Sequence, residues 1–258
     1  MNIQLVYFSP TDSTKNVIHK VVESMNAIIT EEYNLTNQEY EDFNYSFDEN
    51  DLVLLGFPVY GGRLPETAKN RFIGLKGKKT KIAIILTYGD VHYDDSLIET
   101  HEIMKNNGFI TIGMGAFVVQ HNIVKTVGIN RPNDEDYKLI IKFGKELNGK
   151  INENKLEELK IASAKPFGKY KGCPVKPKGN RNCSKCGLCV KLCPQKAIKA
   201  NNPRKNIKNK CISCMRCVKY CSKNARDLTP FEYFVSKIFI GIVKKTKFKK
   251  ENKSEIIV

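Results

Sequence analysis

The chain contains the stretch Cys183-Ser-Lys-Cys186-Gly-Leu-Cys189-Val-Lys-Leu-Cys193-Pro194, followed after a basic, polar spacer by Cys211-Ile-Ser-Cys214-Met-Arg-Cys217-Val-Lys-Tyr-Cys221. The spacing C-x2-C-x2-C-x3-C therefore occurs twice. Three thiolates separated by two residues can wrap around three irons of a [4Fe–4S] cube, and the fourth thiolate then comes from elsewhere in the chain. Zinc and disulfides explain the pattern less well, because structural zinc sites use cysteine pairs and the N-terminus carries no export signal.

The double motif resembles that of bacterial-type two-cluster ferredoxins. The resemblance implies two [4Fe–4S] clusters and a division of eight cysteines between them. One cluster takes Cys183, Cys186, Cys189 and Cys221, and the other takes Cys211, Cys214, Cys217 and Cys193. Ser222 stands where the usual pattern has a proline after the second motif, but that proline is not a ligand. The ninth cysteine, Cys173, is expected to be a free thiol.

Charge divides the chain at about residue 162. Residues 1–162 carry a net charge of −5, whereas residues 163–258 carry +21 together with all nine cysteines. We therefore expect two joined modules, one over 1–162 and one over 181–229, connected by a linker over 163–180 and followed by a basic amphipathic tail over 230–258. The cysteine motifs imply that the second module is a ferredoxin domain. No nucleic-acid partner is expected, because no such motif is recognisable and the clusters offset part of the positive charge.

The start of the chain has no basic segment followed by an apolar one, and no apolar run is long enough to span a bilayer. Cysteine-rich chains without export signals use their thiols for metal or redox chemistry. We therefore expect a cytoplasmic protein, and two solvent-sensitive clusters point to an anaerobe or a reducing compartment.

The N-terminal half begins with an apolar run over 3–8, a hydroxyl-rich loop and a helical pattern over 15–25. A loop between a strand and a helix directs backbone N–H groups at an anion. It resembles the flavodoxin phosphate loop T/S-x-T-G-x-T, although Asp12 stands where that loop has glycine. The resemblance implies a phosphate site at Ser9, Thr11, Ser13 and Thr14, and the alternative is a capped turn without a ligand.

Two further loops follow apolar runs over 51–57 and 81–87. Adjacent glycines allow the backbone to approach a flat ligand, and the chain has no Trp, so tyrosines must supply any stacking surface. Ligands of open α/β sheets bind at the carboxyl ends of the strands. The expected flavin contacts are Pro58, Val59, Tyr60, Gly61, Gly62 and Arg63 in one loop and Thr87, Tyr88, Gly89, Asp90 and Tyr93 in the other.

Strand and helix patterns alternate up to about residue 150, with further strands at 28–35 and 109–119 and helices at 96–107 and 134–147. This half resembles the flavodoxin fold, a doubly wound parallel α/β sheet of order 2-1-3-4-5. A small α+β two-cluster ferredoxin domain is expected after it. The whole arrangement resembles the flavodoxin–ferredoxin fusion proteins of anaerobic bacteria and archaea, and the resemblance implies FMN as the flavin.

These parts predict an iron–sulfur flavoprotein that moves electrons between two [4Fe–4S] clusters and FMN. It would interconvert one- and two-electron transfer between protein redox partners. The alternative is a flavin-dependent reductase of a small molecule that is fed by its own ferredoxin domain. In that case His92, His121 or Tyr93 would supply a proton beside the flavin.

The tail carries an apolar stripe at helical spacing, followed by a run of lysines. The stripe consists of Phe231, Phe234, Val235, Ile238, Phe239 and Ile242. We expect it to pack on the chain's own domains, because a small ferredoxin domain has little apolar core. The alternative partner is an anionic membrane surface, contacted through residues 231–250.

Overall fold

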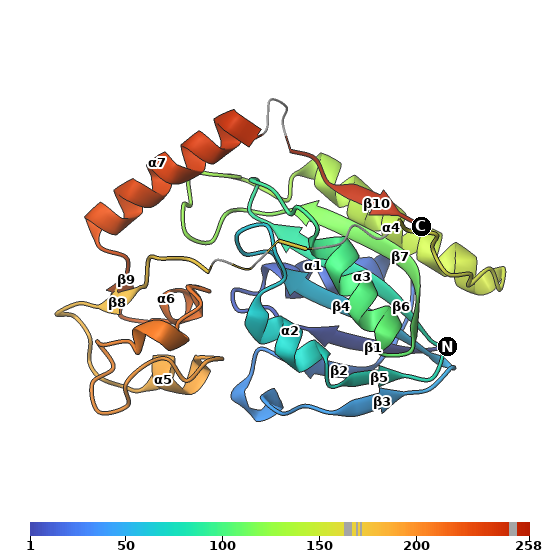
Figure 1. Ribbon diagram of the computed structural model, residues 1–258, viewed down its shortest axis with the longest axis horizontal. Helices are drawn as coiled ribbons and strands as arrows, with labels where there is room; N and C mark the ends of the chain where they lie inside the picture. The colour runs from blue at the N-terminus through green and yellow to red at the C-terminus, as the bar shows by residue number, and fades with distance from the viewer. Residues whose placement is uncertain (163–166, 169, 171, 248–251) are drawn as a thin grey trace.

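The structure is a computed structural model that describes residues 1–162, 167–168, 170, 172–247 and 252–258. Figure 1 shows an α/β module, a smaller cysteine-rich module beside it, and a long helix that runs along the outside from the second module back toward the first.

The first module is built on five parallel strands. They are β1 (Asn2–Tyr7), β2 (Ile29–Asn34), β4 (Asp51–Pro58), β6 (Thr80–Tyr88) and β7 (Phe109–Val118), and they lie in the order β2-β1-β4-β6-β7. The predicted doubly wound class is confirmed. The complete sheet departs from the simple 2-1-3-4-5 order because β10 (Glu255–Ile257) adds a sixth strand, antiparallel to β7. A separate parallel pair joins β3 (Tyr45–Phe47) to β5 (Leu75–Gly77).

Helices cover both faces of this sheet, which is why its strands are continuously apolar. On one face α1 (Ser13–Ser24) packs beside α4 (Asp134–Asn152), and on the other lie α2 (Glu66–Phe72) and α3 (Ser96–Asn106). Gly144 allows α1 and α4 to approach closely, since a Cβ there would lie 2.0 Å from Ser24 Oγ. The sheet thus forms a rigid support for the loops at its carboxyl edge.

The second module is held together by short elements. It contains β8 (Lys178–Gly179), α5 (Leu188–Leu192), a 3-10 turn (Lys208–Lys210), α6 (Arg216–Lys219) and β9 (Arg226–Asp227). The first module has a 3-10 turn of its own at Gln38–Tyr40. The antiparallel pairing of β8 with β9 closes the module. Because β8 lies inside 163–180, that range is not only a linker.

The last 29 residues do not form one tail. They divide into α7 (Pro230–Lys247) and β10, and β10 returns to the sheet of the first module. The cysteine-rich module is therefore connected to the first module at both of its ends. No helix in the described ranges has the length and apolar character that crossing a membrane requires.

Candidate cluster and flavin sites

The two cysteine motifs fold into the same backbone twice, at positions 28 residues apart. Three pairs of equivalent residues have a positive φ: Lys185 and Ser213 (59° and 57°), Gly187 and Met215 (79° and 61°), and Lys196 and Asn224 (both 47°). Equivalent amides also bond to the last cysteine of each motif: Ala197 N–H donates to Cys193 Sγ (3.3 Å) and Ala225 N–H to Cys221 Sγ (3.2 Å). Donors to sulfur stabilise a thiolate that ligates a cluster.

Four of the predicted ligands surround one cavity. Cys211, Cys214 and Cys217 line it together with Cys193, the fourth residue of the other motif. Burial raises the pKa of the Cys217 thiol to about 11, while the nearby Arg226 opposes that effect. A buried thiolate needs compensating positive charge, which iron and arginine can supply. Cys183, Cys186 and Cys189 share the other loop. In the described ranges, no three His, Cys, Asp or Glu side chains are placed to hold a single metal ion.

Two arginines in this cavity wall carry unsatisfied donors. Arg216 and Arg226 are 6% and 2% exposed. Arg216 Nε and Nη1 and Arg226 Nε are buried without a hydrogen-bond partner among the described residues. Buried N–H groups are costly when unpaired. An anionic group rich in sulfur acceptors in the cavity would satisfy them, so the residues fit a [4Fe–4S] cluster.

The second module docks on the first through polar side chains that the sequence reading did not single out. Arg71 is 3% exposed, and its guanidinium donates to the carbonyls of Leu35, of Asn37 (3.0 Å) and, across the interface, of Pro194 (2.9 Å). Gln38 Nε2 donates to the carbonyl of Cys193 (2.7 Å). The backbone of a predicted cluster ligand is therefore fixed by the flavodoxin-like module.

The ferredoxin side also reaches the predicted phosphate loop. Lys219 Nζ lies 2.6 Å from Asp12 Oδ2 and donates to the carbonyl of Thr11 (2.7 Å), and Tyr220 Oη donates to the same carboxylate. Burial disfavours ionisation of Asp12, but the bonds from Lys219 and Tyr220 outweigh it and lower its pKa. The Asp12 carboxylate is thus directed at the second module, and it does not cap α1.

The predicted phosphate loop leads directly into α1. Asp12 has φ = 62°, a left-handed conformation that explains why glycine suits this position and that Asp tolerates. Ser9 Oγ accepts from Lys15 N–H (3.0 Å), and Thr14 Oγ1 bonds to Thr87 Oγ1 (2.8 Å). Thr11 Oγ1 donates to Asn122 Oδ1 (3.0 Å), and Ser13 begins α1. Hydroxyl groups therefore gather at a helix N-terminus whose nearby carboxylate is neutralised by Lys219.

Tyr60, predicted to stack on a flavin, lies at the junction of the modules. Its pKa rises well above the ordinary value because of burial first and then the charge of Cys214. Its hydroxyl is buried without a hydrogen-bond partner in the described part of the chain. Pro58 ends β4, and Val59 N–H donates to the carbonyl of Thr87 (2.8 Å). The loop after β4 therefore carries a buried tyrosine whose pKa responds to the charge of a predicted cluster ligand.

The rest of this loop is packed against its neighbour. Gly61 and Gly62 have φ of 59° and 78°, and a Cβ on Gly62 would lie 2.4 Å from both Asp94 and His92. Open space surrounds the Cβ position of Gly61. Arg63, expected near a flavin, instead forms a buried ion pair with Glu99 (2.7 Å). Its charge is therefore already balanced.

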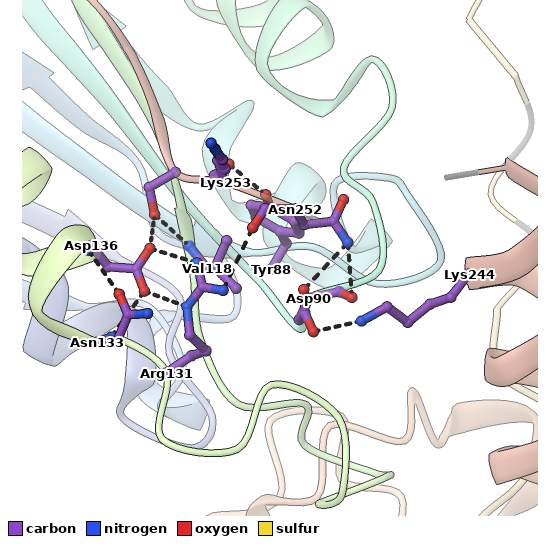
Figure 2. Close-up of polar contacts among 10 residues, drawn as sticks. Tyr88, Asp90, Val118, Arg131, Asn133, Asp136, Lys244, Asn252 and Lys253 are labelled. Atoms are coloured by element: carbon purple, nitrogen blue, oxygen red, sulfur yellow. Dashed lines mark hydrogen bonds and ion pairs between the residues drawn. The ribbon is translucent and has the colours of Figure 1, made fainter. Parts of the chain in front are cut away.

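The loop after β6 is covered by the C-terminal segment, as Figure 2 shows. Tyr88 is 3% exposed in the core, and its hydroxyl donates to the carbonyl of Lys253 (2.8 Å). Asn252 Nδ2 donates to the carbonyl of Asp90 (3.0 Å), and Lys244 Nζ lies 2.6 Å from Asp90 Oδ2. Tyr88 and Asp90, both predicted to contact flavin, thus bind the chain's own C-terminal segment.

A buried ion pair anchors that segment. Arg131 Nη2 bonds to Asp136 Oδ1 (2.7 Å), and Ser254 Oγ donates to the same carboxylate (2.6 Å) while accepting from Val118 N–H (3.0 Å). Asp136 also completes a capping box with Asn133 at the start of α4. The position of β10 is therefore fixed by side chains as well as by strand pairing.

The three predicted proton donors lie in or beside the same loops. His121 packs against Gly89, and its Nδ1 accepts from Ile123 N–H (3.1 Å) and Val124 N–H (3.0 Å). Burial lowers its pKa to about 4. His92 pairs with Asp94 (2.9 Å). Tyr93 Oη donates to Glu255 (3.1 Å), and burial raises its pKa to about 12. A catalytic role for these groups stays a prediction.

The residues present fit FMN at two places: the hydroxyl-rich loop that would receive the phosphate, and Tyr60, whose unsatisfied hydroxyl and open neighbour Gly61 leave room for a ligand. Arg63 instead pairs with Glu99, and Tyr88 donates to the carbonyl of Lys253.

Sequence reasoning missed Arg71, Arg216 and Lys219, because only the fold brings them to the interface. The position of Arg216 and of Lys219 between cysteines of the second motif was the available signal.

A family model described as a 4Fe-4S dicluster domain matches residues 182–226. The sheet order and this match together identify the organisation. The chain joins a flavodoxin-like module to a 4Fe-4S dicluster domain. No curated protein matches the chain.

Three solved structures that resemble the chain cover between 56% and 60% of it. Oxidised flavodoxin 1 from Bacillus cereus has 13% identity and a TM-score of 0.41, over 57% of this chain and 96% of that chain. Two-electron reduced Megasphaera elsdenii flavodoxin has 21% identity and a TM-score of 0.36, over 56% and 98%. The Flv1 flavodiiron core from Synechocystis sp. PCC6803 has 12% identity and a TM-score of 0.42, over 60% of this chain but only 36% of that chain.

Proposed function

We propose that the protein transfers electrons between two [4Fe–4S] clusters and FMN, and exchanges them with protein redox partners. The observation that supports this most strongly is the docking of the second cysteine motif on the predicted phosphate loop. Lys219, which lies between the predicted ligands Cys217 and Cys221, donates to the carbonyl of Thr11 (2.7 Å) and lies 2.6 Å from Asp12. When bound, each cluster would carry one electron and FMN one or two, so the assembly would interconvert single and paired electron transfer.

The chain's own residues would set the geometry of this relay. Arg71 and Gln38 hold the segment around Cys193 against the flavodoxin-like module, and Lys219 fixes α6 on the phosphate loop. Cys214 is 8% exposed, so the junction excludes water. The cluster bound through Cys214 would therefore be the one that exchanges electrons with the flavin, and the cluster bound through the exposed Cys186 would face external partners.

At the flavin, Ser9, Thr11, Ser13 and Thr14 would hold the phosphate at the N-terminus of α1. Tyr60 would lie against the ring system, with its hydroxyl available to a polar edge of the ligand. Lys219, a residue of the ferredoxin side, would add positive charge beside the phosphate. Binding of FMN and docking of the ferredoxin module would then support one another.

The first experiment is an anaerobic ultraviolet–visible spectrum of the purified protein with iron and flavin quantified on the same sample. We expect about eight irons and one FMN per chain. About four irons would contradict the two-cluster proposal. About eight irons with no flavin, and none taken up when FMN is added, would contradict the flavin proposal, and the flavodoxin-like module would then be a docking scaffold for the ferredoxin.

A further inference from the structure

The outward face of α7 is apolar and exposed. Its six large hydrophobic residues are between 43% and 74% exposed: Phe231, Phe234, Val235, Ile238, Phe239 and Ile242. At about 100° per residue they fill an arc of about 140°. The half-buried positions on the opposite side are Tyr233, Ser236, Ile240 and Val243. An ordinary surface helix turns its apolar stripe to the core, and α7 does the reverse, so our expectation that the stripe packs on the protein is wrong.

Contacts at both ends hold the helix in this orientation. Thr229 and Glu232 form a reciprocal cap at its start: Thr229 N–H donates to Glu232 Oε2 (2.9 Å) and Glu232 N–H to Thr229 Oγ1 (3.2 Å). Near its end Lys244 pairs with Asp90. In Figure 1 the helix runs along the outside of the molecule between the two modules. The apolar face is therefore presented on a folded, anchored helix.

Charge indicates what covers this face. The helix sequence contains four lysines and a single acidic residue, Glu232. Lys237 and Lys245 are exposed, and residues 163–258 carry a net charge of +21. Positive charge beside a wide apolar arc suits an anionic lipid surface, where lysines meet headgroups and aromatic residues enter the acyl boundary. A neutral protein groove would use the apolar arc and leave the charge without a partner.

We propose that α7 docks the protein on an anionic bilayer surface, with its axis in the membrane plane and Phe234, Ile238 and Phe239 inserted. The proposal does not depend on bound flavin or on the number of clusters. Because the same helix contacts Asp90 through Lys244, docking would also place the loop after β6 near the bilayer.

The test is sedimentation of the anaerobically purified full chain with vesicles of phosphatidylcholine alone and of an equal mixture with phosphatidylglycerol. We expect binding to the anionic vesicles that weakens as salt rises. The double variant Phe234→Gln/Phe239→Gln should weaken binding by at least about 100-fold. Lys237→Gln/Lys245→Gln should weaken it roughly 30-fold.

The matched control is Ile28→Gln, because Ile28 is an apolar residue that is 87% exposed in the first module. It should leave vesicle binding unchanged. Circular dichroism and iron content show whether each variant is folded. Equal binding to neutral vesicles, no vesicle binding, or an unchanged affinity in the Phe variant would each overturn the proposal. A dimer in light scattering that the Phe variant dissociates, without vesicle binding, would assign the face to a second copy instead.

Discussion

Cys186 and Cys214 occupy equivalent positions in the two cysteine loops, yet the first is exposed and the second is buried. The two loops share their spacing, their positive-φ residues and their amide–sulfur bonds. They differ in what surrounds them. A repeated sequence can thus form two similar cysteine loops, while the tertiary contacts decide which of them docks on the first module.

The same difference extends along the loops. Arg216 lines the cavity of the second motif, whereas its equivalent in the first motif, Leu188, is 41% exposed. Lys219 binds the phosphate loop, whereas the equivalent Lys191 is exposed. The second motif therefore carries the positive charge and the docking contacts. We expect its cluster to have the higher reduction potential, since hydrogen bonds and positive charge near the sulfurs favour the reduced state.

Loss of one ligand from each loop gives the largest expected effect. Cys214→Ala and Cys186→Ala should each reduce the iron content from about eight to about four per chain. In Cys214→Ala an external ferredoxin should still reduce the remaining cluster but not the bound flavin, whereas in Cys186→Ala it should reduce neither, as measured by stopped-flow absorbance. Flavin reduction at the wild-type rate in Cys214→Ala would remove the functional distinction between the loops.

Arg71 tests whether docking depends on the contact to Pro194. Arg71→Met would leave three carbonyl acceptors without their donor, and we expect a loss of about 3 kcal/mol in the free energy of unfolding. Urea unfolding followed by circular dichroism measures it. Arg181→Met is the control, because Arg181 is exposed on the ferredoxin side. An equal effect in the two variants would show that the buried guanidinium does not stabilise the interface.

Exchange of residues between the equivalent positions tests the difference in potential. Arg216→Leu should lower the reduction potential of the cluster in the second-motif cavity by about 40 mV. This value corresponds to a loss of about 1 kcal/mol in a one-electron couple. Leu188→Arg should raise the potential of the other cluster. Redox titrations followed by electron paramagnetic resonance measure both shifts. If neither variant moves a potential, the arginine is not a determinant of the difference.

The Asp12 contact gives the smallest effect and the pH dependence. The pKa of Asp12 is lower in the folded protein than in the unfolded chain. Its bonds to Lys219 and Tyr220 therefore stabilise docking above the ordinary Asp pKa of about 4, and that stabilisation is lost as pH falls through the lowered value. Because the ion pair is partly exposed, the gain is about 1 kcal/mol or less.

Hydrogen exchange of residues 216–221 after rapid pH jumps would measure this loss, with cluster absorbance as a check on integrity. Asp12→Asn should reduce amide protection at pH 7 and remove the pH dependence, while residues 188–193 should be unaffected by the substitution. Equal changes in both segments would contradict a specific role of Asp12 in docking the second loop.

The cysteine spacing and the alternation of apolar runs with helical patterns were enough to predict both modules, because they depend on neighbours within a few residues. The predicted strands and helices agree with β1, α1, β4, β7 and α4 to within a few residues. The strand β10 was missed because three residues with a single partner strand give no local periodicity. The sequence also did not predict the outward orientation of α7. An apolar stripe at helical spacing shows that one face is hydrophobic, but it does not show whether the protein itself covers that face.

The sequence by itself was enough to predict the chemistry of the cysteine motifs. Ligand spacing is a local property, and it predicts iron–sulfur clusters without any knowledge of the rest of the fold. Only the tertiary structure decided how the two modules are arranged, because Lys219 and Asp12 are 207 residues apart and meet through docking of one module on the other. The sequence also did not predict that Arg63 pairs with Glu99 or that the C-terminal segment binds Asp90. These partners are distant in sequence, and a local sequence pattern contains no information about them.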